Sequence, residues 1–568
     1  MRDGTRLAVE IYRPTDRGVV ASVPLPVILH ATPYHRASDD PKTLSLSSGA
    51  SLANELLRHG YVIVSADIRG RGASFGQGVM TNFGDTERND MYDLVEWGGH
   101  QPWSSGKVGT MGCSYPGLTQ LWAASAAPPS MKTMAASSFV IDSFPAFMVN
   151  GATQTAFFDV VEKTMYRLDV TNAGPRVDTD TDGKLLQAAT EDHKRGWAAG
   201  TPSMQKVREA APFRLDPVTD PKLARPLADH YTMIPNMRMA GISELQFSGW
   251  RDIATDQAFA FYGTAASAGI RQKMIIGPWK HCEWYSSDKY NLSAEHLRWF
   301  DYWLKGTQNG AMDGPPIRYY VGGSPAGQEW RTADRWPIPD VTPTSFALWS
   351  DAAGDAGGAL LPAASASARR GRYTYTANYE ASTRAIRGRF NLFSDPAHPL
   401  TDDTATLDAN AVLFATEPFA TDTEIIGYPL LNLWISSTAK DQDFFFYLES
   451  VDPSGKAELI GDGAIRASNR ATRQAPYETF GLPWHSSMRA DQKPLVPGKV
   501  EKLEVALYPM AQRIRAGYRL RLAITNSDKG NFDTPVVTPA PKVTIYFDKD
   551  HPSALTLPIK QASQSASR

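Results

Sequence analysis

Short, continuously apolar segments alternate with helical segments between Pro24 and Phe139. "PVILHA" and "YVIVSADI" are typical of strands buried on both faces, while "GASLANELLRHG" and "LTQLWAASAA" are typical of helices. Strands of this kind, separated by helices, indicate a parallel sheet covered on both faces. The pattern returns in "ISELQFSGW" and "KMIIGPW", after a stretch of mostly helical character. We therefore predict an α/β domain with a helical insertion between two of its strands.

The C-terminal half of the chain has a different pattern. After about Pro315, short alternating runs such as "LLNLWISS", "DFFFYLESV" and "YRLRLAIT" replace helical periodicity. Regularly spaced strands with turn residues between them predict an antiparallel β-sandwich. The predicted domains are an α/β domain in two parts (1–149 and 241–314), a helical insertion (150–240) and a C-terminal β domain (315–560).

Charge and hydropathy exclude two classes of partner. The 58 Lys and Arg nearly balance the 60 Asp and Glu, and no long basic run is present, so no nucleic-acid partner is expected. No stretch approaches the roughly 20 uncharged apolar residues of a membrane-spanning helix, so no membrane partner is expected either. The opening "MRDGTRLAVEIYRP" shows no secretory signal, which predicts a cytoplasmic location. A secreted or periplasmic location stays open if the natural start differs, and homo-oligomer formation is also left open.

The chain has two cysteines, Cys113 and Cys282. Two are too few for a disulfide framework or a cysteine-rich zinc site. We expect both to act as small buried hydrophobic side chains, with the core held by packing alone.

The segment "KVGTMGCSYPG" places Ser114 on a short turn between a predicted strand and a predicted helix. Gly112 lets the strand end and the helix start pass closely, and Pro116 suits the first helical turn. Two interpretations remain: Ser114 caps the helix, or the turn exposes its hydroxyl to a substrate. In the second case the backbone N–H of Tyr115 is free to face an oxyanion.

A nucleophilic serine needs a base, and the base needs an acid to orient it. In strand–helix hydrolases these residues follow the chain order Ser, Asp or Glu, His, each on a loop beyond a strand end. Asp252 in "LQFSGWRDIATDQ" and His281 in "MIIGPWKHCEW" meet both conditions, and Asp256 competes with Asp252. Each residue alone could be a helix cap or a structural group. Their joint order and placement favour Ser114, His281 and Asp252 as a catalytic triad.

The sequence resembles the cocaine esterase and X-Pro dipeptidyl-peptidase family of α/β-hydrolases. The likeness covers nearly the whole chain, through "TPYHR", "ADIRGRGASFG", "GKVGTMGCSYPG", "SGWRDI" and "GPWKH". It implies Ser114, Asp252 and His281 as the triad, a helical cap over the active site and a jelly-roll C-terminal domain. It also implies that Tyr34 shares the oxyanion hole with the amide of Tyr115, whereas the pattern alone would make Tyr34 a packed aromatic residue.

Departures from the family limit the choice of substrate. The α-amino acid ester hydrolases of this family bind the substrate ammonium partly through carboxylates two and three residues after the acid, where this chain has Ala254 and Thr255. A buried ammonium without a carboxylate is costly, so a free α-amino acyl group is not expected. Cocaine esterases carry an aromatic residue at the position of Ala254, so their benzoyl pocket is not implied. Three tryptophans near the acid and base belong either to the core or to an apolar pocket: Trp250, Trp279 and Trp284.

Metal and cofactor sites are not expected. "DTDTDG", at 178–183, copies the start of a calcium loop, but the twelfth position is Ala189 instead of Glu, so we predict an acidic loop leading into a helix. The eleven histidines show no metal-ligand spacing.

The predicted function is a serine hydrolase that cleaves small carboxylic esters, with amides as further substrates, through an acyl-enzyme. The partner is then a small-molecule ester or amide. Two alternatives stay open: an X-Pro dipeptidyl-peptidase, and a non-catalytic carbohydrate-binding protein on an inactive hydrolase scaffold.

Overall fold

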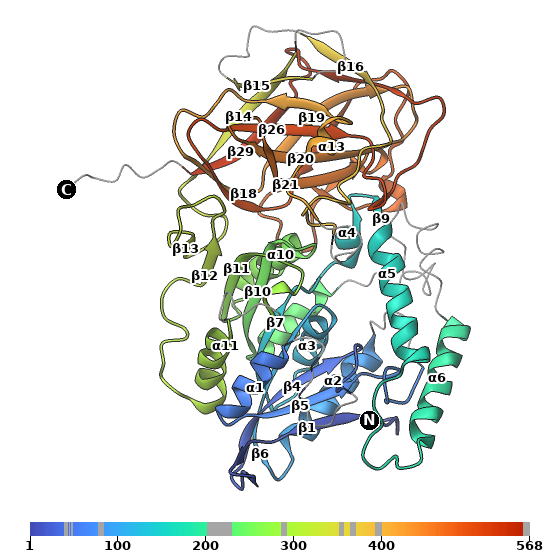
Figure 1. The fold of residues 1–568 in the computed structure, drawn as a ribbon, viewed down its shortest axis with the longest axis vertical. Coiled ribbons are helices and arrows are strands. Elements are labelled where there is room, and N and C mark those ends of the chain that lie inside the picture. The colour runs from blue at the N-terminus through green and yellow to red at the C-terminus, as the bar shows by residue number, and fades with distance from the viewer. Residues whose placement is uncertain are drawn as a thin grey trace, which may run out of the picture.

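The computed structural model describes residues 1–38, 44, 46, 49–77, 84–200, 230–285, 292–350, 357–363, 371–391 and 400–560. An α/β domain carries a layer of helices along one side, and a β-rich domain lies against one end of it (Figure 1). No helix in the described ranges is both long and apolar enough to cross a membrane.

The α/β domain is built on a nine-stranded sheet. In spatial order its strands are β1 (Val9–Tyr12), β5 (Val62–Asp67), β4 (Leu25–Thr32), β6 (Ser104–Cys113), β7 (Met131–Ser137), β10 (Ser243–Arg251), β11 (Gln272–Lys280), β12 (Ile317–Tyr320) and β13 (Trp330–Ala333). The strands from β5 to β12 run parallel, and the two edge strands are antiparallel. The predicted α/β class is therefore confirmed.

Helices cover both faces of this sheet. Helices α2 (Asp85–Gly99), α3 (Tyr115–Ala126) and α10 (Thr255–Ser267) share one hydrophobic core with the sheet, and α1 (Ala50–Arg58) and α11 (Ser293–Phe300) share another. Successive residues of β4 point to opposite faces, so Val27 and Leu29 enter the first core and Ile28 the second. Two-sided burial explains why these strands are continuously apolar.

The predicted boundary at residue 315 is too early. Strand β12 pairs with β11, and β13 pairs with β12, so the α/β sheet continues to Ala333. Alternate residues of β12 are buried and half-buried, because this strand lies close to the sheet edge. That alternation resembles the pattern of a sandwich strand, which explains the error.

The helical insertion lies beside the α/β domain (Figure 1). Its main described elements are α4 (Ser143–Phe147), α5 (Thr155–Tyr166), which continues into a turn at 167–171, α6 (Lys184–Gly200) and α9 (Ile234–Met239). Asp169 ties the insertion to the sheet domain, because its carboxylate pairs with Arg71 and accepts a 2.8 Å hydrogen bond from the indole of Trp197. Residues 201–229 of the predicted cap lie outside the described residues.

The "DTDTDG" loop leads into α6, as predicted. Asp180 accepts hydrogen bonds from the backbone N–H groups of Leu185 and Leu186 at 3.0 and 2.9 Å. The carboxylate thus satisfies two N–H groups that have no partner within the helix.

The C-terminal domain is a β-sandwich. Its longer strands are β14 (Val341–Trp349), β19 (Leu430–Ser437), β20 (Asp443–Val451), β21 (Ala457–Arg466), β26 (Arg519–Thr525) and β29 (Ala554–Lys560). Their inward side chains form one large core that includes Leu433, Phe446 and Leu522. Backbone pairing joins this domain to the rest of the chain, because β27 (Phe532–Asp533) pairs with β9 (Ala152–Gln154).

Candidate active site

Ser114 lies on a strained turn between β6 and α3. Its φ is +67°, and its side chain makes no capping hydrogen bond to the helix. A Cβ atom on Gly112, whose φ is +152°, would lie 2.5 Å from the ring of Pro116, and one on Gly117 would lie 2.6 Å from the carbonyl oxygen of Ser137. The turn therefore requires both glycines. Of the two interpretations of Ser114, the structure favours the one that presents the hydroxyl.

The structure brings Ser114, Asp252 and His281 together. The Nε2 atom of His281 lies 2.8 Å from Oγ of Ser114, and its Nδ1 lies 2.9 Å from Oδ1 of Asp252. All three residues follow the carboxyl ends of parallel strands, β6, β10 and β11, which explains why residues so distant in sequence meet. The side chain of Asp252 is fully buried, whereas that of His281 is 17% exposed.

Asp252 is held in its ionised form. Burial alone raises the pKa of this carboxyl, but the charge of His281 and hydrogen bonds from His281, Ser138 and the N–H of Ala254 together lower it below its ordinary value. Ser138 donates to Oδ2 of Asp252, while His281 contacts Oδ1. Sequence reasoning missed Ser138, although it follows the end of β7, which lies between β6 and β10.

Arg389 of the C-terminal domain also holds the loop of the acid. Its guanidinium donates to the backbone carbonyl of Asp252, to Oγ1 of Thr255 at 2.7 Å and to the carbonyl of Trp250 at 2.8 Å. It pairs with Asp462 at 2.8 Å and is only 4% exposed. Sequence reasoning missed this residue because nothing in "RGRFN" links it to a loop 137 residues earlier.

Tyr34 follows β4 and lies beside the nucleophile. Burial raises the pKa of its phenol, while hydrogen bonding to the side chain of Ser114 and to the backbone of Tyr115 acts in the opposite direction. The phenol is therefore positioned next to both Ser114 and the Tyr115 amide. Two hydrogen-bond donors beside a serine hydroxyl can stabilise an oxyanion on a bound acyl group.

Cys113 and Cys282 form a disulfide, with 5.8 Å between their Cα atoms. The prediction that both are unpaired hydrophobic residues is therefore wrong, as is the expectation that packing alone holds the core. Two cysteines 169 residues apart give no sequence signal of pairing. A signal existed in their positions, however: if Ser114 and His281 touch, their chain neighbours Cys113 and Cys282 must also be close.

The remaining predicted residues supply no side chain to the contacts among Ser114, His281 and the Asp252 carboxylate. Ala254 and Thr255 are fully buried. Asp256 does not contact His281 and lines a separate cavity instead. The three tryptophans belong to the hydrophobic cores, with 9%, 1% and 5% of their surface exposed: Trp250, Trp279 and Trp284.

Two family models match the chain. Residues 3–283 match the X-Pro dipeptidyl-peptidase (S15 family), and residues 309–556 match the X-Pro dipeptidyl-peptidase C-terminal non-catalytic domain. The chain belongs to the cocaine esterase and X-Pro dipeptidyl-peptidase family of α/β-hydrolases. It is accordingly a serine hydrolase of this family.

Individual relatives agree with this assignment. The chain is 27% identical to a Mycobacterium bovis protein named "Putative serine esterase", over 99% of this chain and 94% of the relative. It is 28% identical to the cocaine esterase of a Rhodococcus species, over 84% and 83% of the two chains. Its fold is similar to that of a CocE/NonD family hydrolase from Staphylococcus aureus, with a TM-score of 0.74, 19% identity and coverage of 99% and 92%.

Proposed function

We propose that this protein is a serine esterase that hydrolyses small carboxylic esters through an acyl-enzyme intermediate. The observation that carries the proposal is the unbroken contact from Ser114 through His281 to Asp252, beside two oxyanion donors. Relatives named as esterases align with nearly the whole chain, which supports ester chemistry.

Each residue has a defined role in this mechanism. Oγ of Ser114 attacks the ester carbonyl carbon while Nε2 of His281 accepts its proton. The ionised carboxylate of Asp252 accepts a hydrogen bond from Nδ1 and stabilises the imidazolium. The Tyr34 hydroxyl and the Tyr115 N–H stabilise the oxyanion. His281 then returns the proton to the leaving alcohol, and water releases the acid from Ser114 by the same steps.

An X-Pro dipeptidyl-peptidase is the second candidate, since the match of residues 3–283 is to a model of that name. Such an activity requires recognition of a peptide's free amine. Ala254 and Thr255, where related ester hydrolases place carboxylates, are uncharged and fully buried here. This favours an ester without a free α-amino group.

The decisive comparison uses nitrophenyl esters of increasing acyl length and an X-Pro nitroanilide. We expect turnover of short acyl esters and at least about 100-fold lower kcat/KM for the nitroanilide, equivalent to about 2.7 kcal/mol. Preference for the nitroanilide would replace the esterase assignment with the peptidase one.

A fluorophosphonate probe tests the nucleophile separately. We expect it to label the folded protein, and we expect Ser114→Ala to abolish labelling and lower kcat by roughly 10⁴- to 10⁶-fold, as for loss of a nucleophile from such a triad. Unlabelled wild-type protein would favour the non-catalytic binding alternative, and retained turnover by Ser114→Ala would exclude this serine as the nucleophile.

A further inference from the structure

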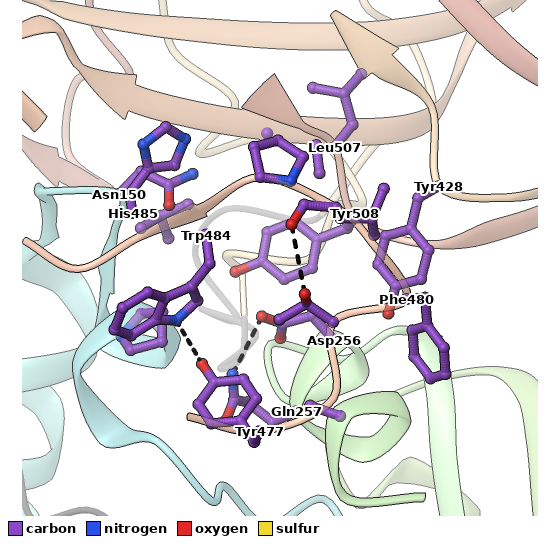
Figure 2. A pocket seen from close by; sticks show the side chains of 18 of the residues that line it. Asn150, Asp256, Gln257, Tyr428, Tyr477, Phe480, Trp484, His485, Leu507 and Tyr508 are labelled. Carbon is purple, nitrogen blue, oxygen red and sulfur yellow. Dashed lines mark hydrogen bonds between the residues drawn. The ribbon is translucent and has the colours of Figure 1, made fainter. Parts of the chain in front are cut away.

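A cavity of about 110 Å³ lies between the α/β domain and the C-terminal domain. Residues from α4 and the segment just after it, from the first turns of α10 and from four segments of the sandwich domain line it (Figure 2). None of the triad residues is among its lining residues, so it is separate from the candidate active site. No described lysine or arginine lines it, whereas two carboxylates do, those of Asp256 and Glu478.

Asp256 lines this cavity and carries a buried carboxylate oxygen. Its Oδ2 accepts a 3.3 Å hydrogen bond from the amide of Gln257, but its Oδ1 has no partner among the described residues. Burial raises the pKa of this carboxyl to about 6, so it is mostly ionised at neutral pH. The nearby cation, Arg389, is already paired with Asp462 at 2.8 Å.

Tyr508 supplies a second polar group. It is 6% exposed, and its hydroxyl has no hydrogen-bond partner in the described part of the chain. The carboxylate of Asp256 acts on the pKa of this phenol, which places the two groups near each other. Leaving a buried hydroxyl and a buried carboxylate oxygen unsatisfied costs about 1–3 kcal/mol each, so both favour a ligand that can approach them.

Two aromatic pairs complete the lining. The rings of Tyr428 and Phe480 are 6.4 Å apart, and those of Tyr477 and Trp484 are 6.2 Å apart. In Figure 2 these pairs lie on opposite sides of Asp256. Aromatic faces attract cations through their quadrupoles, by about 0.5–2 kcal/mol per contact. Carboxylates and aromatic faces together select a positive charge on an apolar body.

We propose that this interdomain cavity, formed around Asp256, Tyr508 and the two aromatic pairs, binds a small organic cation of the alkylammonium or quaternary ammonium class. The ammonium lies against Oδ1 of Asp256, its alkyl groups contact the aromatic rings, and the oxygen of Tyr508 faces the positive charge. A neutral molecule of the same shape gains the packing but not the charge interactions.

Isothermal titration calorimetry with choline and its neutral isostere 3,3-dimethylbutan-1-ol tests this site. We expect saturable binding of one choline per chain and at least about tenfold weaker binding of the alcohol, equivalent to 1.4 kcal/mol. The same titration with Ser114→Ala should give the wild-type affinity. Because that readout needs no turnover, failure of the cation site and failure of the esterase proposal are seen separately.

Variants locate the binding. Asp256→Asn should weaken choline binding at least about tenfold, and Tyr508→Phe should weaken it a few-fold. Asp340→Asn removes the same charge from an exposed position and serves as the matched control, with wild-type affinity expected. If Asp256→Asn does not fold, Phe480→Ala tests the aromatic wall instead. The proposal is overturned if choline shows no saturable binding, if the isostere binds with equal affinity, or if Ser114→Ala loses binding. It is also overturned if Tyr508→Phe and the cavity variant that folds both bind choline with wild-type affinity.

Discussion

The two loops that position the imidazole are held by different means. The Asp252 loop is fully buried and is held by hydrogen bonds from Ser138 and from Arg389 of the second domain. The His281 loop is partly exposed and is held by a covalent bond, since Cys282, whose φ is +56°, is joined to Cys113 beside the nucleophile. Orientation of the acid therefore depends on domain docking, whereas the disulfide ties the loop of the base to the strand end that precedes the nucleophile.

Removing Arg389 should have the largest effect on this arrangement. Arg389→Ala leaves Asp462 as an uncompensated buried charge and frees the loop of the acid. Loss of one partner of a buried pair costs about 3–5 kcal/mol, and a displacement of about 1 Å at a reacting group costs about 100-fold in rate. We expect a lower Tm and a kcat about 100-fold below wild type at a temperature where both proteins are folded.

Asp462→Asn is the matched control for that variant. It removes the ion pair but keeps the donors to the carbonyls of Trp250 and Asp252, so stability should fall while kcat stays within about threefold of wild type. Similar kcat losses in Arg389→Ala and Asp462→Asn would mean that Arg389 stabilises the interface without positioning the acid.

The sequence predicts the triad residues better than it predicts the contacts that hold their loops. Ser114, Asp252 and His281 could be predicted because parallel strands bring their following loops to one edge of a sheet, so local patterns suffice. Arg389 could not be predicted in this way, because it lies in the second domain, 137 residues from Asp252, and the strand order of the α/β sheet does not place it. The two cysteines are 169 residues apart and meet only as neighbours of Ser114 and His281, so their pairing follows from the triad and not from a pattern of their own.

The two misread elements, β12 and β13, have the same cause. The alternating burial of β12 and the mostly half-buried pattern of β13 reflect how deeply each residue is covered, and neither shows which sheet the strand joins. Membership of a sheet is decided by hydrogen-bonded neighbours, which the local sequence does not identify. The elements that were predicted correctly, such as β4 and β5, have interiors apolar on both faces, and that pattern is found almost only in covered parallel sheets.

Breaking the disulfide tests how much this covalent bond contributes to holding the His281 loop. A cross-link between such distant residues contributes about 2–5 kcal/mol, so the double variant Cys113→Ala, Cys282→Ala should lose several degrees of Tm. We expect kcat to fall less than tenfold, because the hydrogen bond between His281 and Ser114 can still form.

A reducing agent should reproduce these changes in wild type and leave the double variant unaffected. Unchanged wild-type stability under conditions that fully reduce the bond would contradict a structural role for it. Disulfides are rare in the cytosol, so we propose that the protein works in an oxidising compartment rather than in the cytoplasm that the sequence predicts.

Ser138→Ala should have the smallest effect. It tests the hydrogen bond from Ser138 that helps to hold the Asp252 carboxylate. The hydroxyl stabilises the ionised form of Asp252, whose pKa lies below its ordinary value. A carboxyl whose pKa is lower in the folded protein stabilises the fold at pH values above its pKa in the unfolded chain, about 3.9. This stabilisation is lost as the pH falls through the pKa of the folded protein. Without Ser138 the folded pKa rises, so acid unfolding should begin at a higher pH, and kcat should fall about three- to tenfold.

Urea unfolding between pH 3 and 7 measures the shift, and Ser137→Ala provides the matched control. Ser137 is also fully buried, but its hydroxyl has no partner among the described residues. Its removal should therefore leave the pH at which acid unfolding begins unchanged. If the free energy of unfolding falls over the same acidic pH range in Ser138→Ala and in wild type, His281 and the Ala254 amide alone hold Asp252 ionised. The hydrogen bonds from Arg389 across the domain interface would then be the polar contacts that hold the Asp252 loop, whereas the disulfide holds the His281 loop.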